Sequence, residues 1–140
     1  MTATNTFALC VFFLIAILGV VMVIQSFVRP FAAFGLFKIA SGFDFTETKN
    51  KDNDTSNAFK TLLSFQSSAL FGGNSMTLFL SWMAFHDLIA LAWWALWYWP
   101  IMFLWHFIIY KKGTPLWYVQ IVWIILSVTA LLLTRSIALP

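Results

Sequence analysis

The chain alternates between long, uninterrupted runs of apolar residues and short polar breaks. Four such runs cover residues 7–28, 61–85, 88–110 and 116–134. Each run is close to the roughly 20 residues that an α-helix needs to cross the hydrocarbon core of a bilayer. The pattern therefore predicts an all-α, polytopic membrane protein with four transmembrane helices in a compact bundle, and residues 1–140 are expected to form a single membrane domain.

The polar breaks set the boundaries between these helices. A continuous helix over residues 61–110 would be about 75 Å long, which is far more than a bilayer is thick. We therefore expect a turn at His86-Asp87, where the charged dipeptide lies. Gly113-Thr114-Pro115 follows two lysines and is typical of a helix stop and restart. Pro100 is expected to kink the third helix.

The connection between the first two predicted helices has two parts. Residues 30–45 contain five phenylalanines and are too short to span a membrane and too apolar for water. We expect this part to be an interfacial segment that lies along the lipid headgroups. Residues 46–58 are rich in Asn, Asp, Lys and Thr, which predicts a polar cytoplasmic loop.

Basic residues predict the orientation of the four helices. Seven of the eight Lys and Arg residues fall in the two connections on one side of this layout, and only Arg135 falls on the other side. The positive-inside rule assigns the basic side to the cytoplasm. Both termini are therefore predicted on the non-cytoplasmic side of the membrane.

Composition narrows the function classes. Hydrophobic residues make up 61% of the chain and charged residues 9%, against about 25% charged in an ordinary soluble domain. So few charges could not cover a soluble fold, which excludes soluble enzymes and nucleic-acid-binding proteins. The predicted helices contain no Asp, Glu, Lys or Arg, which argues against proton or ion coupling. We predict no catalytic residues, no metal site and no cofactor.

One hydrogen-bonding side chain lies near the predicted cytoplasmic end of each helix. These side chains are Gln25, Gln66, His106 and Gln120. They would lie about 5–8 Å below the membrane boundary and form a polar layer if they face inward. In one interpretation, they hold the helices together by hydrogen bonds. In the other, they bind the headgroup of a lipid or lipid-like ligand in an otherwise apolar pocket.

The second and third predicted helices each carry a face suited to contact with other helices. A stripe of small residues, spaced by four, four and three positions, consists of Ser64, Ser68, Gly72 and Ser75. Such stripes let helix backbones approach closely, within the bundle or against a partner. A candidate aromatic docking face on the third helix consists of Trp94, Trp97, Ile101 and Trp105. The alternative for this face is a flat apolar ligand such as a quinone, carotenoid or sterol.

Asn74 lies in the middle of the second predicted helix, after a pair of glycines. An amide at membrane depth is costly without a hydrogen-bond partner. We expect such a partner on another helix, for example Ser127.

Several of these breaks resemble those of the small, four-span DoxX-like membrane proteins. The matching positions are Pro30, Phe34-Gly35, Phe71-Gly72-Gly73-Asn74 and Gly113-Thr114-Pro115. The arginine that often precedes the Gly-Gly element in such proteins is absent, and Ser67-Ser68-Ala69 occupies that region. The resemblance implies a four-span architecture. It carries over no catalytic residues, because the family mostly lacks an assigned activity.

These observations favour a non-enzymatic integral membrane protein that acts as an accessory or structural subunit of a larger membrane complex. Its expected partners are membrane lipids and other membrane protein subunits, with no nucleic acid. The alternative is a lipid- or quinone-binding membrane protein with a polar headgroup site near the cytoplasmic face. A membrane enzyme is the weakest hypothesis, because only His106 could act as a general base at membrane depth.

Overall fold

The computed structural model describes residues 1–28, 38–39 and 53–139, and these ranges contain helices and turns but no strand. The all-α prediction is therefore confirmed for the described residues. The helices are α1 (Ala3–Val28), α4 (Asn53–Phe85), α5 (Ala90–Ala95), α6 (Tyr98–Ile109) and α7 (Pro115–Leu133), followed by the short 3₁₀ helix η1 (Arg135–Ile137). The predicted interfacial segment 30–45 lies outside the described residues except for Lys38 and Ile39, and so does the predicted polar loop before Asn53.

Three stretches of the described chain are long and apolar enough to cross a membrane. They are Ala3–Ser26, Ala90–Ile109 and Pro115–Leu133. The second of these joins α5 and α6 across the break between them. The length and composition of these three stretches are compatible with a membrane protein.

The start of α4 differs from the prediction. Residues 53–58 were expected in the polar loop, but α4 begins at Asn53 and continues to Phe85. Asp54 lies in its first turn, where a carboxylate interacts favourably with the positive end of the helix dipole. Hydropathy indicates where a helix can meet lipid and does not indicate where the helix begins, so a polar first turn is easily taken for a loop.

The predicted kink in the third apolar run is confirmed as a break between α5 and α6. The break lies at Leu96 and Trp97, one turn before Pro100. Proline has no N–H to offer the carbonyl four residues earlier, which here is that of Leu96. That carbonyl instead accepts a hydrogen bond from the Trp99 N–H at 3.2 Å. The Leu96 carbonyl therefore keeps a hydrogen-bond partner at the point where the chain changes direction.

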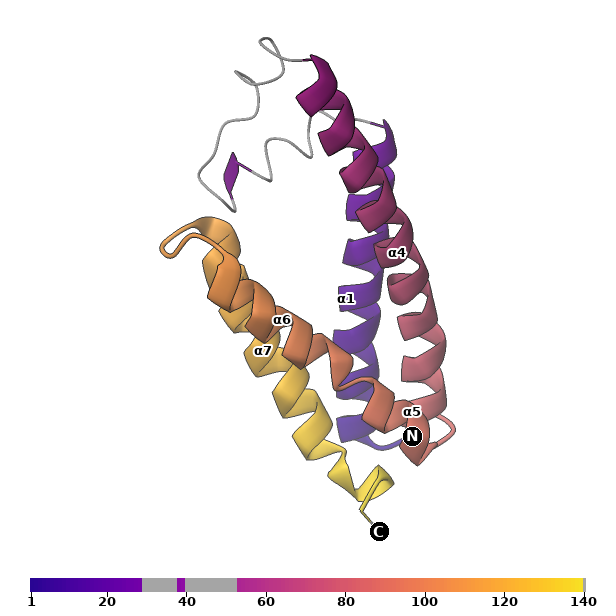
Figure 1. The fold of residues 1–140 in the computed structure, drawn as a ribbon. Coiled ribbons are helices and arrows are strands. Elements are labelled where there is room, and N and C mark those ends of the chain that lie inside the picture. The colour runs from indigo at the N-terminus through magenta and orange to yellow at the C-terminus, as the bar shows by residue number, and fades with distance from the viewer. Residues whose placement is uncertain (29–37, 40–52, 140) are drawn as a thin grey trace.

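The helices form two antiparallel pairs that meet at one end and separate toward the other (Figure 1). The first pair is α1 and α4, and the second is α6 and α7. Contacts of α4 with α5 and of α1 with α7 join the two pairs. The start of α1, the turn after α4 and the end of α7 all lie at the end where the pairs meet (Figure 1).

That meeting end holds the apolar core. Phe12 and Phe85 are fully buried and stack with their ring centroids 5.7 Å apart. The Asn5 amide donates to the Phe85 carbonyl at 3.2 Å, which satisfies a carbonyl at the end of α4. The other buried members of the core include Ala8, Ile15, Ala84, Ala92, Trp93, Leu96, Trp99 and Leu131.

The predicted turn after α4 is confirmed. His86 Nδ1 lies 2.7 Å from Asp87 Oδ1, and both side chains are exposed. The His86 ring also stacks on Trp82, with centroids 4.3 Å apart. Leu88 follows with a φ of 58° and completes the reversal.

The predicted stop and restart before α7 is also present as a turn. Gly113 has a φ of 80°, and Thr114 Oγ1 caps α7 by accepting a hydrogen bond from the Trp117 N–H.

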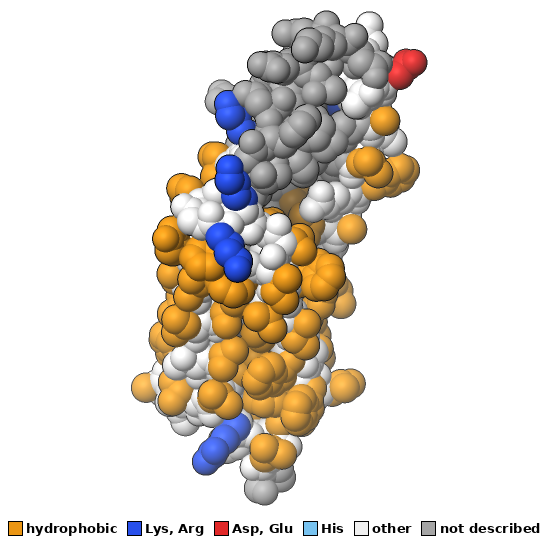
Figure 2. Space-filling model, turned by 60° about the vertical axis from the view of Figure 1, so that its left-hand side comes forward, with side chains coloured by type: hydrophobic (Ala, Val, Ile, Leu, Met, Phe, Trp, Pro, Cys, Tyr) orange, Lys and Arg blue, Asp and Glu red, His pale blue; other side chains and the backbone are white. Residues whose placement is uncertain are grey.

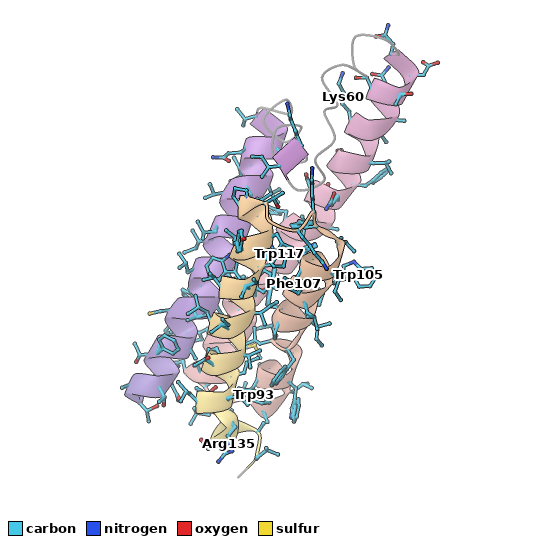
Figure 3. All side chains as sticks on the ribbon, turned by 90° about the vertical axis from the view of Figure 1, so that its left-hand side faces the viewer. Lys60, Trp93, Trp105, Phe107, Trp117 and Arg135 are labelled. Carbon is cyan, nitrogen blue, oxygen red and sulfur yellow. The ribbon has the colours of Figure 1, made fainter. Side chains whose placement is uncertain are left out.

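The surface has the pattern of a membrane protein. Apolar side chains form a broad band, with Lys and Arg side chains at both of its ends (Figure 2). Lys60 and Arg135 lie near opposite ends of the molecule (Figure 3).

Candidate functional site

A cavity of about 490 Å³ lies among α1, α4, α6 and α7, where the two helix pairs separate. This volume is within the range of about 300–1,000 Å³ that is typical of ligand pockets. Most of the lining is apolar and includes Ile15, Leu18, Met22, Met102, Phe103 and Trp123. The lining residues come from the later half of α1, the middle of α4, the whole length of α6, and the first half of α7.

The cavity brings together most of the predicted polar layer. Gln66, His106 and Gln120 all line it, each from a different helix. Gln25 does not line it and is exposed, whereas its neighbour Ser26 does. A helix turns by about 100° per residue, so a one-residue difference in position is enough to move a side chain off the cavity face.

Asn74 also lines the cavity, and its hydrogen bonding differs from the prediction. Its Nδ2 donates to the Leu70 carbonyl at 2.7 Å, one turn earlier in the same helix. Ser127 Oγ donates to the carbonyls of Trp123 and Ile124. The expected Asn74–Ser127 bond is therefore wrong, because both side chains bond to their own helix.

Two amide oxygens in the cavity wall have no hydrogen-bond partner. They are Asn74 Oδ1 and Gln120 Oε1, and both atoms are buried. Gln120 resembles Asn74, because its Nε2 donates to the carbonyl of Leu116 at 3.2 Å while its oxygen stays unpaired. The bonds from the two amide nitrogens could be expected from the sequence, since such side chains can bond back to their own helix. The sequence holds no signal that the amide oxygens are unpaired.

The described lining of the cavity carries no Asp, Glu, Lys or Arg side chain. Its ionisable groups are His106 and Tyr110, whose rings stack with centroids 5.1 Å apart. Within the described ranges, no group of three His, Cys, Asp or Glu side chains could hold a metal ion. The cavity can therefore offer amide, hydroxyl, imidazole and indole contacts to an uncharged molecule.

Three tryptophans join helices through their indole N–H groups, a role that the sequence analysis missed. Trp99 Nε1 donates to Thr77 Oγ1 at 2.8 Å and so links α6 to α4. Trp93 Nε1 donates to Thr134 Oγ1 at 3.0 Å, and Trp117 Nε1 donates to the carbonyl of Phe107 at 3.0 Å. Trp93, Phe107 and Trp117 are labelled in Figure 3. An indole N–H away from water needs an acceptor, so threonines in other apolar helices were a usable signal.

The predicted aromatic docking face is divided by the break before α6. Trp94 and Trp105 are exposed, as is Ile101 between them. Trp97 is only partly exposed, and its Nε1 is buried without a partner. The residues lie on two helices with a break between them, so the regular helical spacing of the prediction does not continue across all four. Their contact with another protein stays a prediction.

The predicted small-residue stripe lies mostly on the outside of α4. Ser64, Ser68 and Gly72 are exposed and Ser75 is partly buried. A different set of small and polar residues forms the buried face of α4: Ser67, Asn74, Thr77, Ser81 and Ala84. Gly19 of α1 packs directly against the Asn74 side chain. The contact of α4 with α1 shown by Gly19 and Asn74 therefore lies on a different face of α4 from the predicted stripe.

The site as a whole is a largely apolar cavity whose lining includes polar side chains from four helices, α1, α4, α6 and α7. No protein-family model, curated protein or solved structure matches this chain.

Proposed function

We propose that the chain is an integral membrane protein with four transmembrane helices that binds a lipid-like or quinone-like molecule in the cavity between its helix pairs. The observation that carries this proposal is the convergence of Gln66, His106 and Gln120 on one largely apolar cavity. A few fixed polar groups in an apolar pocket are what orients the head of an amphiphile.

The fourth crossing would be made by α4. Its residues 61–85 contain no charged side chain, and its charged residues Asp54 and Lys60 lie near its start. Its moderate hydropathy reflects hydroxyl and amide groups, several of which bond back to the helix, as Ser68, Thr77 and Ser81 do. Such back-bonding satisfies polar groups without water and suits a helix in a membrane.

Cysteine labelling tests the four-span topology. In a Cys10→Ser background, Lys112→Cys and Ser136→Cys place one thiol in the turn before α7 and one after α7. A membrane-impermeant maleimide should label these two variants from opposite sides of sealed vesicles. Asp87→Cys should react from the same side as Ser136→Cys. Lys60→Cys, near the start of α4, should react from the side opposite to Asp87→Cys, and labelling of these two variants from the same side would contradict a fourth crossing by α4.

Lipid retention tests the binding site. We expect wild-type protein purified in mild detergent to retain a defined lipid or quinone, identified by mass spectrometry of its extract. Gln66→Leu and His106→Phe should lower the retained amount several-fold, because each removes a polar contact from the cavity. Ser64→Ala is the control on the same helix, since Ser64 does not line the cavity. Retention unchanged in both cavity variants would contradict the proposal.

Exposed apolar side chains favour a second function, that of an accessory subunit in a membrane complex. Trp94 is 52% exposed and Trp105 is 61% exposed. Trp94→Ala with Trp105→Ala should remove co-purifying membrane subunits if this surface docks a partner, while lipid retention stays unchanged. A complex that survives both substitutions would exclude the surface from assembly.

A further inference from the structure

The cavity has a floor where it meets the apolar core. Ile15 and Trp99 line the cavity and also belong to the core cluster. Trp99 is held there by the bond from its Nε1 to Thr77 Oγ1, which crosses from α6 to α4. Phe12 and Leu96, each three residues further toward the end where the helix pairs meet, are fully buried and do not line the cavity. The cavity therefore ends at Ile15 and Trp99.

The flanks of the cavity are open and apolar. Four apolar side chains line it and are also exposed on the surface of the molecule: Leu18, Met22, Ile109 and Val119. A side chain does both only where the cavity reaches the surface. All four belong to the three stretches that are long and apolar enough to cross a membrane. In a membrane, the cavity would therefore open sideways to the hydrocarbon of the lipids.

The depth of the cavity matches one leaflet of a bilayer. Its lining extends along α1 from Ile15 to Ser26 and along α6 from Trp99 to Tyr110 at the helix end. At the rise of an α-helix, each of these stretches is about 16 Å long. Half of a typical hydrocarbon core is about 15 Å thick. The floor would therefore lie near the middle of the bilayer, where the acyl chains of one leaflet end.

The wall of the cavity suits a flexible apolar chain. Met22 and Met102 contribute to it from α1 and α6, and methionine side chains adapt to irregular apolar shapes. No described lining residue is Asp, Glu, Lys or Arg, so a chain that enters does not desolvate a charge.

We propose that the cavity takes up an acyl chain of a membrane lipid sideways from the surrounding leaflet. The chain ends against the floor at Ile15 and Trp99, and the lipid head stays at the other end of the lining, near Gln66 and His106. This inference rests on the proposed function and narrows its ligand from a lipid-like or quinone-like molecule to a lipid with an acyl chain.

Photocrosslinking from the lipid tests the inference. The full chain is reconstituted in phosphatidylcholine nanodiscs, in which a small share of the lipid carries a diazirine at the end of one acyl chain. After irradiation, mass spectrometry of peptides locates the adducts. We expect adducts on Ile15 and Trp99, which are 4% and 5% exposed and line the cavity. Ile125 is 59% exposed and does not line the cavity, so its adducts measure labelling from the outer lipid.

A second lipid probe tests the orientation of the chain. With the diazirine beside the ester group, adducts should form on His106, and labelling of Ile15 and Trp99 should fall several-fold. Equal labelling of the floor by the two probes would overturn the proposed orientation. Both measurements use the wild-type chain, so a substitution that prevents folding does not remove the test.

A matched pair of variants assigns the floor adducts to the cavity. Met102→Trp adds bulk inside the cavity, whereas Ile101→Trp adds the same side chain at a position that is 63% exposed and does not line it. Met102→Trp should lower the adducts on Ile15 several-fold relative to those on Ile125, and Ile101→Trp should leave them unchanged. Floor adducts that persist in Met102→Trp, with helical content unchanged by circular dichroism, would overturn uptake through the cavity.

An aqueous probe separates lipid from water as the source of the ligand. Azipentanoate, a water-soluble carboxylate that carries a diazirine, should leave Ile15 and Trp99 unlabelled. Floor adducts from azipentanoate would show that the cavity opens to water at this depth and would overturn uptake from the leaflet.

The inference and the proposed function fail in different ways. Absence of floor adducts in a protein whose lipid retention still depends on Gln66 and His106 would overturn chain uptake and leave lipid binding intact. Floor adducts in a protein whose retention is unchanged by both substitutions would overturn recognition of the head by these side chains and leave chain uptake intact.

Discussion

The two ends of the helix arrangement share α1, α4 and α7 and yet differ in kind. At the closed end, where the pairs meet, Phe12, Phe85 and Leu96 are fully buried. At the open end, where the pairs separate, these three helices and α6 surround a cavity of about 490 Å³. The closed end is filled by its own side chains, and the open end has room for another molecule.

Residue size and polarity explain this difference. The closed end receives bulky rings from α1, α4 and α5, which fill the space between the pairs. The open end receives Gly19 and Ser67, which fill little, and Gln66 and Gln120, which need polar partners. The break at Leu96 and Trp97 lies between the two regions, so α6 can leave the direction of α5. Under the proposed function, stability and binding would be separated along the length of the helices.

The largest loss of stability is expected from Phe12→Ala. Phe12 is fully buried and stacks on Phe85, so the substitution leaves a cavity in the closed end. We expect a loss of about 3–4 kcal/mol in the free energy of unfolding. Unfolding in mixed micelles by increasing amounts of dodecyl sulfate, followed by circular dichroism, measures it.

Ile17→Ala is the matched control on the same helix. Ile17 is 50% exposed, so lipid or detergent replaces its contacts and the loss should stay below about 1 kcal/mol. Equal losses for the two variants would show that the closed end is not the main source of stability.

Two glycines give the next contrast. Gly19→Ala places a Cβ on the Asn74 side chain, which is buried and bonded to its own helix. We expect a loss of about 1–3 kcal/mol, because Asn74 or the α1–α4 contact must shift.

Gly72→Ala is the control for Gly19→Ala. A Cβ at Gly72 meets no atom within 4 Å, so the gain in helix propensity should leave stability equal or raise it by up to about 1 kcal/mol. The same micelle titration reads both variants. A loss at Gly72 as large as that at Gly19 would place an unrecognised contact on the outer face of α4.

Much of the fold could be predicted from the sequence because it depends on local chemistry. The turn at His86-Asp87, the restart at Pro115 and the break before Pro100 each follow from residues at that position. The start of α4 could not be predicted in the same way. A polar first turn satisfies a helix as well as a loop, and hydropathy does not separate the two.

The candidate site could be predicted only in part. Equal depth on different helices grouped Gln66, His106 and Gln120, which all line the cavity, because helix rise fixes depth. Rotation about each helix axis depends on packing with neighbours, which is why Gln25 falls outside the cavity. The tryptophan–threonine bonds and the unpaired oxygen of Asn74 depend on two helices at once, and a linear pattern does not contain that information.

A smaller effect is expected where the two ends join. Trp99→Phe removes the indole N–H that Thr77 Oγ1 accepts and keeps an aromatic ring in the core. Because Thr77 Oγ1 also donates to the Gly73 carbonyl, it keeps one bond, and the loss should be about 1 kcal/mol. Trp105→Phe is the control, since Trp105 is 61% exposed and should show no measurable change. Equal stabilities of the two variants would mean that this bond contributes nothing.

The smallest change in stability is expected from Gln120→Met, at the open end. The substitution removes a buried amide oxygen without a partner, while the Leu116 carbonyl lies inside α7 and can keep its helical hydrogen bond. The free energy of unfolding should therefore change by less than about 0.5 kcal/mol, or rise. Ligand retention should nevertheless fall, which separates this variant from Phe12→Ala, where lower stability affects both readouts. If Gln120→Met destabilises the protein as much as Trp99→Phe does, Gln120 holds helices together and the open end is an extension of the core.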